Sequence, residues 1–274
     1  TLMRSSAASD VYKRQIAHIY ENHKEEIPCS MRTVYEYIDK CYLSARNIDM
    51  HRTVRYKKRT KHEETPKVSP RKKIGHRHDD FLKYIEDHPG IRIVQMDTVE
   101  GVKGGKLLQT FLWPENNLML AYLIDSKEMS STVRVIDYIE ETIGIEKFKE
   151  LFPVILTDNG SEFADPEKFE KGINGEKRTR LYYCEARHSE QKGELEKNHE
   201  YIRYVLPKKT SFDELTQEKV QLMINHINNT SRPKFNGETP INKALKSFDK
   251  NAMEKLGLEI ILPDEVHLKP ELLK

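Results

Sequence analysis

The residues best suited to chemistry are two aspartates, each at the end of a short apolar run. Asp158 comes after the run 153–156 and before the Asn-Gly pair at 159–160, a strong turn signal. This pattern predicts a buried strand whose carboxylate lies at the edge of a sheet, where open α/β sheets bind ligands. Asp97 lies at the end of the run 91–97, so the two acids would converge if their strands are neighbours. An isolated aspartate at a turn is more often an N-cap, so a binding site depends on further partners.

A third acid is expected from a helix predicted over 193–206, whose first turn would pass over the same edge of the sheet. Its candidates are Glu194, Glu196 and Glu200. Residues two apart on a helix point about 200° apart, so Glu194 and Glu196 cannot both face the site. We select Glu196, because it neighbours the apolar stripe of this helix. Asp125, at the end of another apolar run, is a rival that we assign to a turn.

Three carboxylates without suitable histidine or cysteine ligands favour a hard cation, Mg²⁺ or Mn²⁺. Two such ions about 4 Å apart can activate a water or a 3′-hydroxyl and stabilise the leaving oxygen during phosphoryl transfer. The predicted chemistry is therefore two-metal-ion phosphoryl transfer, with Asp97, Asp158 and Glu196 as catalytic residues and metal ligands.

The chain around these acids predicts five strands and two main helices in a mixed order. Short apolar runs predict the strands, at 91–97, 106–112, 118–124, 153–156 and 180–184. Short turns join the first three, which predicts an antiparallel meander. Helical spacing predicts a helix over 132–142, with Ser130 as its N-cap, in addition to the helix over 193–206.

The segment before these strands predicts a DNA-binding module. A short helical pattern at 16–22, a break and a second helix over 31–40 with Ser30 as N-cap have the shape of a helix–turn–helix. Its second helix would offer Arg32 and Thr33 to a DNA groove. Any small helical hairpin shows the same spacing, so that alternative stays open.

A basic segment follows the helical module. Residues 52–73 contain ten Lys or Arg and two Glu, a net charge of +8, whereas the whole chain carries only +2. Such concentrated charge beside a helix–turn–helix fits phosphate binding by counterion release, and we assign Lys57, Lys58 and Arg59 to DNA binding. A solvated linker that binds nothing is the alternative.

The composition limits the class of protein. The 274 residues suffice for one large domain or two modest ones, with 37% hydrophobic and 33% charged residues. Three cysteines without a C-x-x-C pair argue against a disulfide framework or a cysteine-rich zinc site and fit a reducing compartment. No apolar run approaches 18 residues, so we expect no membrane span and a cytoplasmic protein.

Three motifs, at 95–99, 156–163 and 188–196, together resemble the signatures of DDE transposases and retroviral-type integrases. The Gly-x-x-Glu spacing at 193–196 matches the third-acid motif of these enzymes. The segment 201–209, the helix–turn–helix and the basic linker are most similar to the bacterial insertion-sequence thirty family.

The resemblance implies a ribonuclease-H-like core, a mixed five-stranded sheet with flanking helices, with Asp97, Asp158 and Glu196 holding two Mg²⁺ or Mn²⁺ ions. It implies an enzyme that cuts the inverted-repeat ends of a transposon and joins their 3′-hydroxyls to target double-stranded DNA. We expect it to act as a homo-oligomer on DNA in the bacterial nucleoid.

Three further residues receive roles, Arg203 in DNA binding and Asn159 and His188 as secondary site residues. Arg203 follows Glu196 by seven residues and shares its helix face, where the family places a basic residue against DNA; the alternative is a plain surface arginine. Asn159 would shape the metal-binding loop. His188 would touch DNA or a carboxylate, although a lone loop histidine is more often merely polar.

Two features depart from the family pattern. Thirty-seven residues separate Asp158 from Glu196, somewhat more than usual, and 167–176 reads as an insertion. The family's first DNA-binding module, expected upstream of Ile16, is missing. A ribonuclease-H-like nuclease without strand transfer, or a truncated non-catalytic DNA-binding protein, is therefore an alternative function. The expected parts are an artefactual or disordered leader, a helix–turn–helix, a basic linker, a catalytic core and a C-terminal helical extension with a tail, at 1–15, 16–50, 51–80, 81–210 and 211–274.

Overall fold

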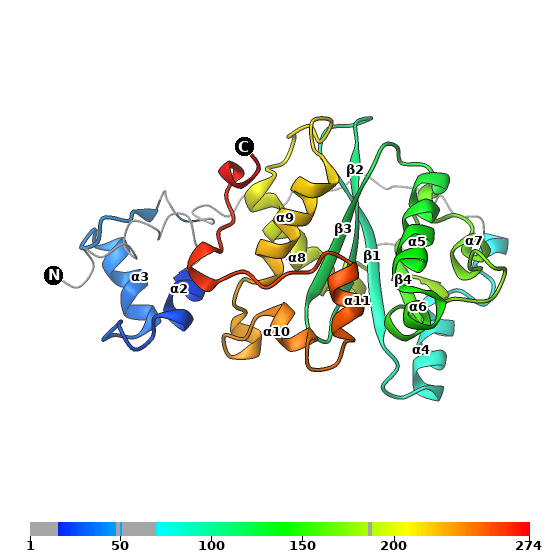
Figure 1. Ribbon diagram of the computed structural model, residues 1–274, viewed down its shortest axis with the longest axis horizontal. Coiled ribbons are helices and arrows are strands. Elements are labelled where there is room, and N and C mark those ends of the chain that lie inside the picture. Colours follow the sequence, from blue (N-terminus) through cyan, green and yellow to red (C-terminus); the bar gives the residue numbers. More distant parts are fainter. Residues whose placement is uncertain (1–15, 48–49, 51–69, 186–187) are drawn as a thin grey trace.

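The computed structural model describes residues 16–47, 50, 70–185 and 188–274 (Figure 1). The expected leader at 1–15 and most of the basic linker, with Lys57, Lys58 and Arg59, lie outside these described residues. No helix in the described ranges is both long enough and apolar enough to cross a membrane.

The centre of the molecule is a mixed five-stranded sheet with the strand order β3-β2-β1-β4-β5. The strands are β1 (Ile93–Glu100), β2 (Leu107–Trp113), β3 (Leu118–Ile124), β4 (Val154–Thr157) and β5 (Arg180–Tyr183). The first three form an antiparallel meander, and β4 and β5 extend it with parallel pairings. This topology confirms the predicted ribonuclease-H-like fold. It also makes β1 and β4 neighbours, the condition on which the convergence of Asp97 and Asp158 depended.

Helices cover both faces of the sheet. Their bounds are α2 (Ile16–Asn22), α3 (Met31–Asp39), α4 (His78–Asp87), α5 (Met129–Ile143), α6 (Ile145–Leu151), α7 (Pro166–Glu170), α8 (Gly193–Val205), α9 (Gln217–Asn228), α10 (Pro240–Ala244) and α11 (Lys250–Lys255). Figure 1 shows α8 and α9 on one side of the sheet and α5 on the other. Every residue of β2 is buried, as expected for a strand covered on both faces.

Helix α5 begins earlier than predicted, at Met129, so Ser130 is not its N-cap. The chain is extended at Glu128, whose carbonyl oxygen accepts the first helical hydrogen bonds from Ser131 and Thr132. Ser130 already lies inside the first turn. The predicted end of this helix is confirmed, since Gly144 follows its last residue.

The helical module of α2 and α3 has its own small apolar core, which includes Val34 and Ile38. Ser30 caps α3 as predicted, because its Oγ accepts a 3.2 Å hydrogen bond from the backbone N–H of Thr33. His18 fastens α2 to the rest of the chain: its Nδ1 accepts from the backbone N–H of Ser231 at 2.9 Å. Its Nε2 then donates to the carbonyl oxygen of Pro263 at 3.1 Å.

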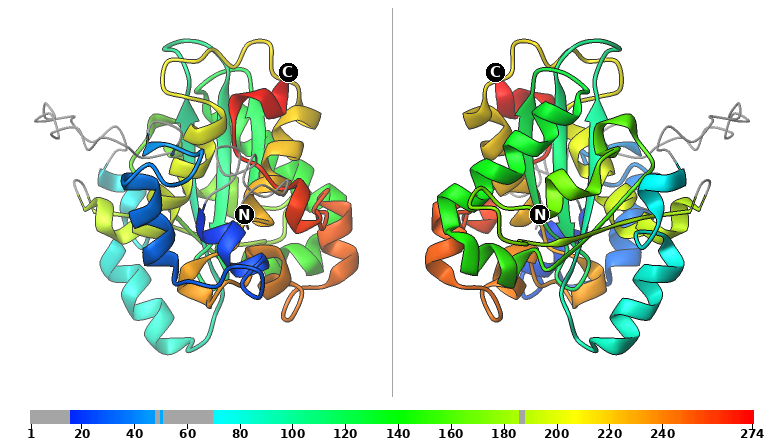
Figure 2. Two further views of the ribbon diagram at one scale, coloured as in Figure 1. Left: turned by 90° about the vertical axis from the view of Figure 1, so that its left-hand side faces the viewer. Right: turned by 90° about the vertical axis from the view of Figure 1, so that its right-hand side faces the viewer.

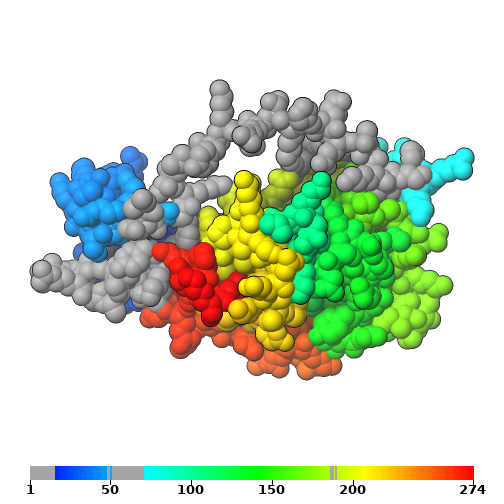
Figure 3. Space-filling model, turned by 90° about the horizontal axis from the view of Figure 1, so that it is seen from above, coloured from blue at the N-terminus to red at the C-terminus, as the bar shows by residue number. Residues whose placement is uncertain are grey.

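The C-terminal segment runs along the molecule rather than away from it. Its last turn, Pro270–Leu273, packs against α8 and α9, and Figure 3 shows this red segment beside the yellow helices. Helix α4, cyan in Figure 2, packs on β5 at the opposite edge of the sheet from β3. The face of β4 and β5 beneath α4 is apolar, with Leu156 and Tyr182 against Phe81.

Candidate functional site

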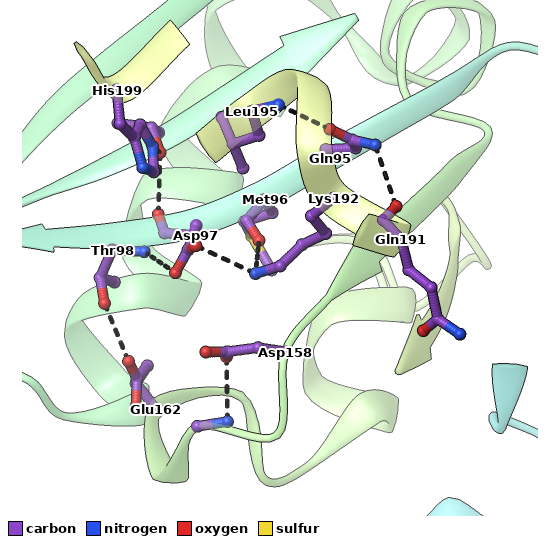
Figure 4. Close-up of polar contacts among 12 residues, drawn as sticks. Gln95, Met96, Asp97, Thr98, Asp158, Glu162, Gln191, Lys192, Leu195 and His199 are labelled. Atoms are coloured by element: carbon purple, nitrogen blue, oxygen red, sulfur yellow. Dashed lines mark hydrogen bonds and ion pairs between the residues drawn. The ribbon is translucent and has the colours of Figure 1, made fainter. Parts of the chain in front are cut away.

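Asp97 and Asp158 lie on one face of the sheet because of the register between β1 and β4. The last parallel pair of these strands joins Gln95 to Leu156, and each aspartate lies two residues beyond that pair. Side chains two apart on a strand point to the same face, so the two carboxylates approach one another (Figure 4). Asp97 is inside β1 rather than at its end, because β2 continues to pair with β1 as far as Glu100.

The two carboxylates are oriented by backbone donors. Oδ1 of Asp97 accepts a 2.7 Å hydrogen bond from the N–H of Thr98, and Oδ1 of Asp158 accepts one of 3.0 Å from the N–H of Gly160. Burial raises the pKa of Asp158, and the negative charge of Asp97 raises it further, whereas the positive charge of Lys192 opposes both effects. Negative charge is therefore concentrated in a partly dehydrated place.

Lys192 supplies a positive charge between the two acids, and sequence reasoning missed it. Its side chain is buried, and Nζ lies 3.0 Å from Oδ2 of Asp97 and 3.4 Å from the carbonyl oxygen of Met96. Burial alone would lower the pKa of Lys192, but the carboxylates of Asp97 and Asp158 raise it, so the amine is an ammonium. In the sequence, the available indication of this role was that a basic residue directly precedes the predicted helix.

Gln95 fixes the start of α8 over β1. Its Oε1 accepts a 3.0 Å hydrogen bond from the backbone N–H of Leu195, one of the unpaired donors of a helix N-terminus. Its Nε2 donates to the carbonyl oxygen of Gln191 at 3.2 Å, in the short 3-10 helix Ser189–Lys192. The amide of Gln95 therefore holds the chain on both sides of Lys192 (Figure 4).

One stripe of α8 and the residue before it runs along β1. Residues three and four apart share a helix face, and this face carries Lys192, Glu196, His199 and Arg203. Nε2 of His199 donates to Oγ1 of Thr110 at 2.9 Å, and Thr110 donates to the carbonyl oxygen of Asp97 at 3.2 Å. Burial lowers the pKa of His199 to about 4, so this ring is neutral.

Glu196 lies on this stripe. Burial raises the pKa of the Cys184 thiol, and the negative charges of Asp158, Asp97 and this glutamate raise it further. The side chain of Glu196 is exposed and has no hydrogen bond or ion pair with the described residues. Across these residues, no group of three or more His, Cys, Asp or Glu side chains is gathered closely enough to hold a metal ion. The structure thus brings Asp97 and Asp158 together, and it packs α8, the helix that carries Glu196, against β1.

The rival acids are placed differently. Glu194 forms an ion pair with Lys234, with 2.6 Å between Oε1 and Nζ. Asp125 is exposed after β3, the strand at the edge of the sheet farthest from β4 and β5. Glu200 is half-buried one turn further along α8.

Glu162 is a fourth acid near the site, also missed in the sequence. Its carboxylate is buried, and Oε1 accepts a 2.9 Å hydrogen bond from the hydroxyl of Thr98 and lies 3.4 Å from Nζ of Lys127. Its Oε2 is buried without a hydrogen-bond partner among the described residues. A Cβ atom at Gly160 would lie 2.5 Å from this oxygen, so a side chain there would have to displace the carboxylate of Glu162. The available signal was a glutamate four residues after Asp158.

Asn159 and His188, the secondary residues, line one cleft beside the two acids. Nδ2 of Asn159 donates to the carbonyl oxygen of Cys184 at 2.8 Å and ties the end of β4 to the chain after β5. His188 is exposed, and its Nδ1 lies 2.6 Å from Oε1 of Glu190. The cleft has a volume of about 480 Å³ and is lined by Lys73, Arg77, His78, Asp79, Asn159, Tyr183, Cys184, Glu185 and His188.

The other predicted DNA-binding residues differ in exposure. Arg32 is 90% exposed on α3, where Nε lies 3.4 Å from Oε1 of Glu36. The hydroxyl of Thr33 is engaged with Oγ of Ser30 at 2.8 Å. Arg203 is half-buried rather than a plain surface arginine, because its Nη2 donates to the carbonyl oxygen of Glu100 at 2.7 Å.

Comparison with known proteins gives relatives of one kind. No protein-family model matches the chain. The transposase for insertion sequence element IS4351 of Bacteroides fragilis is 29% identical over 109 residues, 40% of this chain and 32% of the relative. A probable transposase for insertion-like sequence element IS1161 of Streptococcus salivarius is 26% identical over 220 residues, 78% of this chain and 58% of the relative. A putative integrase of Spiroplasma virus SpV1-R8A2 B is 33% identical over 82 residues, 30% of this chain and 24% of the relative.

The chain thus spans from about a quarter to three-fifths of the length of these relatives. Among solved structures, the catalytic core domain of BIV integrase matches with a TM-score of 0.40 and 18% identity, covering 58% of this chain and 96% of that one. A simian T-cell lymphotropic virus intasome matches with a TM-score of 0.44 and 16% identity, covering 58% and 55%. Because these scores are low, the fold assignment depends on the strand order described above.

Proposed function

We propose that this chain contains the catalytic core of a DNA transposase of the bacterial insertion-sequence thirty family. It would cut the inverted-repeat ends of a transposon and join their 3′-hydroxyls to target DNA with two Mg²⁺ or Mn²⁺ ions. The observation that carries the proposal is the approach of Asp97 and Asp158 on one face of a ribonuclease-H-like sheet. We infer the reaction from the relatives, which are named as transposases.

The residues present fit a hard divalent cation. Asp97 and Asp158 offer carboxylate oxygens, the ligands that Mg²⁺ prefers, and a backbone N–H orients each carboxylate. Glu196 would complete the set from the first turn of α8, which Gln95 holds over β1. Bound divalent ions supply Lewis acidity and activate a water or a 3′-hydroxyl at such a site.

The protein would orient DNA from several elements. Lys73 and Arg77 line the cleft beside Asp158, and burial together with the neighbouring charge of Arg77 lowers the pKa of Lys73. A phosphodiester in this cleft would relieve that repulsion. We assign sequence-independent phosphate contacts to these residues and to Lys57, Lys58 and Arg59.

Sequence recognition and stable positioning would come from the rest of the chain. We assign the reading of the transposon ends to α3, because Arg32 is exposed on it and Thr33 is its neighbour. Arg203 would contact DNA near the two aspartates, because it lies on the same face of α8 as Glu196. We further propose that the chain works as a homo-oligomer on double-stranded DNA in the bacterial nucleoid.

The test is cleavage and strand transfer of a duplex that carries the terminal inverted repeat, measured with Mg²⁺. Asp97→Asn, Asp158→Asn and Glu196→Gln should each reduce the rate by roughly a hundredfold or more, because residues that act as a unit fail together. Glu146→Gln, a change at an 83% exposed acid on α6, is the control and should stay near wild type. Retained activity in any of the three variants would remove that residue from the mechanism.

The same assay separates the two alternatives. Hydrolysed ends without joined products would identify a ribonuclease-H-like nuclease that lacks strand transfer. DNA binding that needs no Mg²⁺ and produces no nick would identify a non-catalytic DNA-binding protein.

A further inference from the structure

The side chain of Lys192 places a positive charge directly against Asp97. Nζ lies 3.0 Å from Oδ2 of Asp97 and 3.4 Å from the carbonyl oxygen of Met96, and the whole side chain is buried. The second carboxylate oxygen, Oδ1, accepts the hydrogen bond of the Thr98 N–H. Both oxygens of Asp97 are therefore engaged within the protein, and one of them is engaged by a cation.

We propose that Lys192 competes with a divalent cation for Asp97 and thereby sets the metal affinity of the site. This inference rests on the proposed function, in which Asp97 is a metal ligand. A magnesium ion binds a carboxylate oxygen at about 2.1 Å, so an ion on Oδ2 and an ammonium beside it would repel each other strongly. Binding of the metal at this oxygen must displace Nζ.

When a metal ion replaces Nζ at Asp97, only the end of the Lys192 side chain has to move. The backbone on either side of Lys192 is fixed, because Gln95 accepts from the N–H of Leu195 and donates to the carbonyl oxygen of Gln191. The four-carbon stem of lysine is flexible, so Nζ can leave Asp97 without movement of α8.

Lys127 provides a matched control for this proposal. It is a second lysine beside the acids, with Nζ 3.4 Å from Oε1 of Glu162, and its side chain is 40% exposed. Its positive charge also acts on Asp158. Removing it therefore removes one charge from the same neighbourhood while the contact between Lys192 and Asp97 remains.

The experiment is titration of the full chain with Mg²⁺, without DNA, by isothermal calorimetry. Lys192→Met should bind Mg²⁺ at least about tenfold more tightly than wild type, because the ion no longer displaces a buried partner. Lys127→Met should gain clearly less. The melting temperature gives a second readout: in EDTA, Lys192→Met should melt below wild type, and Mg²⁺ should raise its melting temperature by more.

A second variant protects the test against a folding defect. Lys192→Gln keeps a hydrogen-bond donor near Asp97 and loses the charge, so it should also bind Mg²⁺ more tightly. Magnesium binding by either variant in the absence of binding by wild type would support the competition in its strongest form.

The competition and the proposed function fail in different ways. Unchanged or weaker binding in both Lys192 variants, with Asp97→Asn abolishing binding in an otherwise wild-type chain, would overturn the competition and leave the metal site standing. A gain in Lys127→Met equal to that in Lys192→Met would also overturn it, since general charge would then explain the effect. Absence of binding in wild type and in every variant would overturn both.

Discussion

The hydroxyl of Thr98 donates a 2.9 Å hydrogen bond to Oε1 of Glu162, a carboxylate buried beside the loop that carries Asp158. The backbone N–H of the same threonine donates to Oδ1 of Asp97 at 2.7 Å. One residue of β1 therefore joins the first aspartate to an acid from the loop after β4. Lys127 balances the charge of Glu162, which allows a carboxylate to be buried there.

Thr98→Val should disturb the loop that carries Asp158 without changing any acid. Valine has a similar shape, but it cannot donate to Glu162, so the loop after β4 loses its link to β1. Changes of this kind around metal ligands typically cost about 10–100-fold in activity or metal affinity, and we expect that range for strand cleavage. Thr98→Ser keeps the hydroxyl and should stay close to wild type. Cleavage by Thr98→Val at the wild-type rate would show that the link between Thr98 and Glu162 plays no part in positioning the loop of Asp158.

Gln95→Leu should loosen the start of α8. It leaves the N–H of Leu195 and the carbonyl oxygen of Gln191 without their partner, a loss of about 1–3 kcal/mol for a buried polar group. We expect a lower melting temperature and slower cleavage, because this turn carries Glu196.

The control for that prediction is Gln109→Leu, a change at another glutamine buried in the sheet. The amide of Gln109 donates only to Sδ of Met96, at 3.3 Å, and its Oε1 has no hydrogen-bond partner in the described part of the chain. Its replacement should be neutral or stabilising. Equal effects of the two changes on melting and cleavage would argue against a special role for Gln95.

The strands and the pair of aspartates could be predicted because local patterns mark them, whereas the ribonuclease-H-like fold was implied by the resemblance to transposases and integrases. Apolar runs bounded by turns mark the strands, and a carboxylate after such a run marks the edge of a sheet. The prediction that Asp97 lies at the end of β1 was wrong, because pairing with β2 extends that strand to Glu100. A strand ends where its partners end, and a partner distant in the sequence leaves no local signal.

The remaining parts of the site depend on contacts between distant segments. Lys192 and Glu162 are ordinary charged residues in the sequence, and they become part of the site only because Asp97 and Thr98 lie against them. The helix geometry predicted which face Glu196 shares, and it could not predict that the side chain is exposed. For the same reason, no local pattern could predict that His18 is buried and hydrogen-bonded to Ser231 and Pro263.

Arg178→Met should destabilise the segment between Asp158 and Glu196. The side chain is fully buried, with Nη1 2.6 Å from Oδ1 of Asp137 and 2.8 Å from Oε2 of Glu140, both on α5. Removing the arginine leaves the buried carboxylate of Glu140 without a cation beside it, which typically costs about 3–5 kcal/mol in the free energy of unfolding. Urea unfolding of the full chain measures the loss.

The matched control for this prediction is the neighbouring change Lys177→Met. Nζ of Lys177 lies 2.8 Å from Oε2 of Glu170, and the lysine side chain is 50% exposed. Glu170 is only 13% exposed, but it keeps the 2.9 Å hydrogen bond from the N–H of Leu181. Ion pairs of exposed lysines contribute about 0–1 kcal/mol, so this variant should unfold nearly like wild type. Similar losses in the two variants would show that the buried arginine is not specially important for the segment 166–178.

His226 should make the protein less stable as the pH falls from about 6.5 to about 4. Its ring is buried on α9, and Nδ1 accepts a 3.2 Å hydrogen bond from the backbone N–H of His267. Burial, and then the charge of the nearby His267, lower the pKa of His226 from 6.5 to about 4. Below pH 6.5 the unfolded chain therefore binds a proton that the folded chain does not, so stability falls until the folded ring also titrates. The melting temperature of His226→Asn, whose amide oxygen can still accept from His267, should fall less over this range, and an equal fall in both proteins would contradict the assignment.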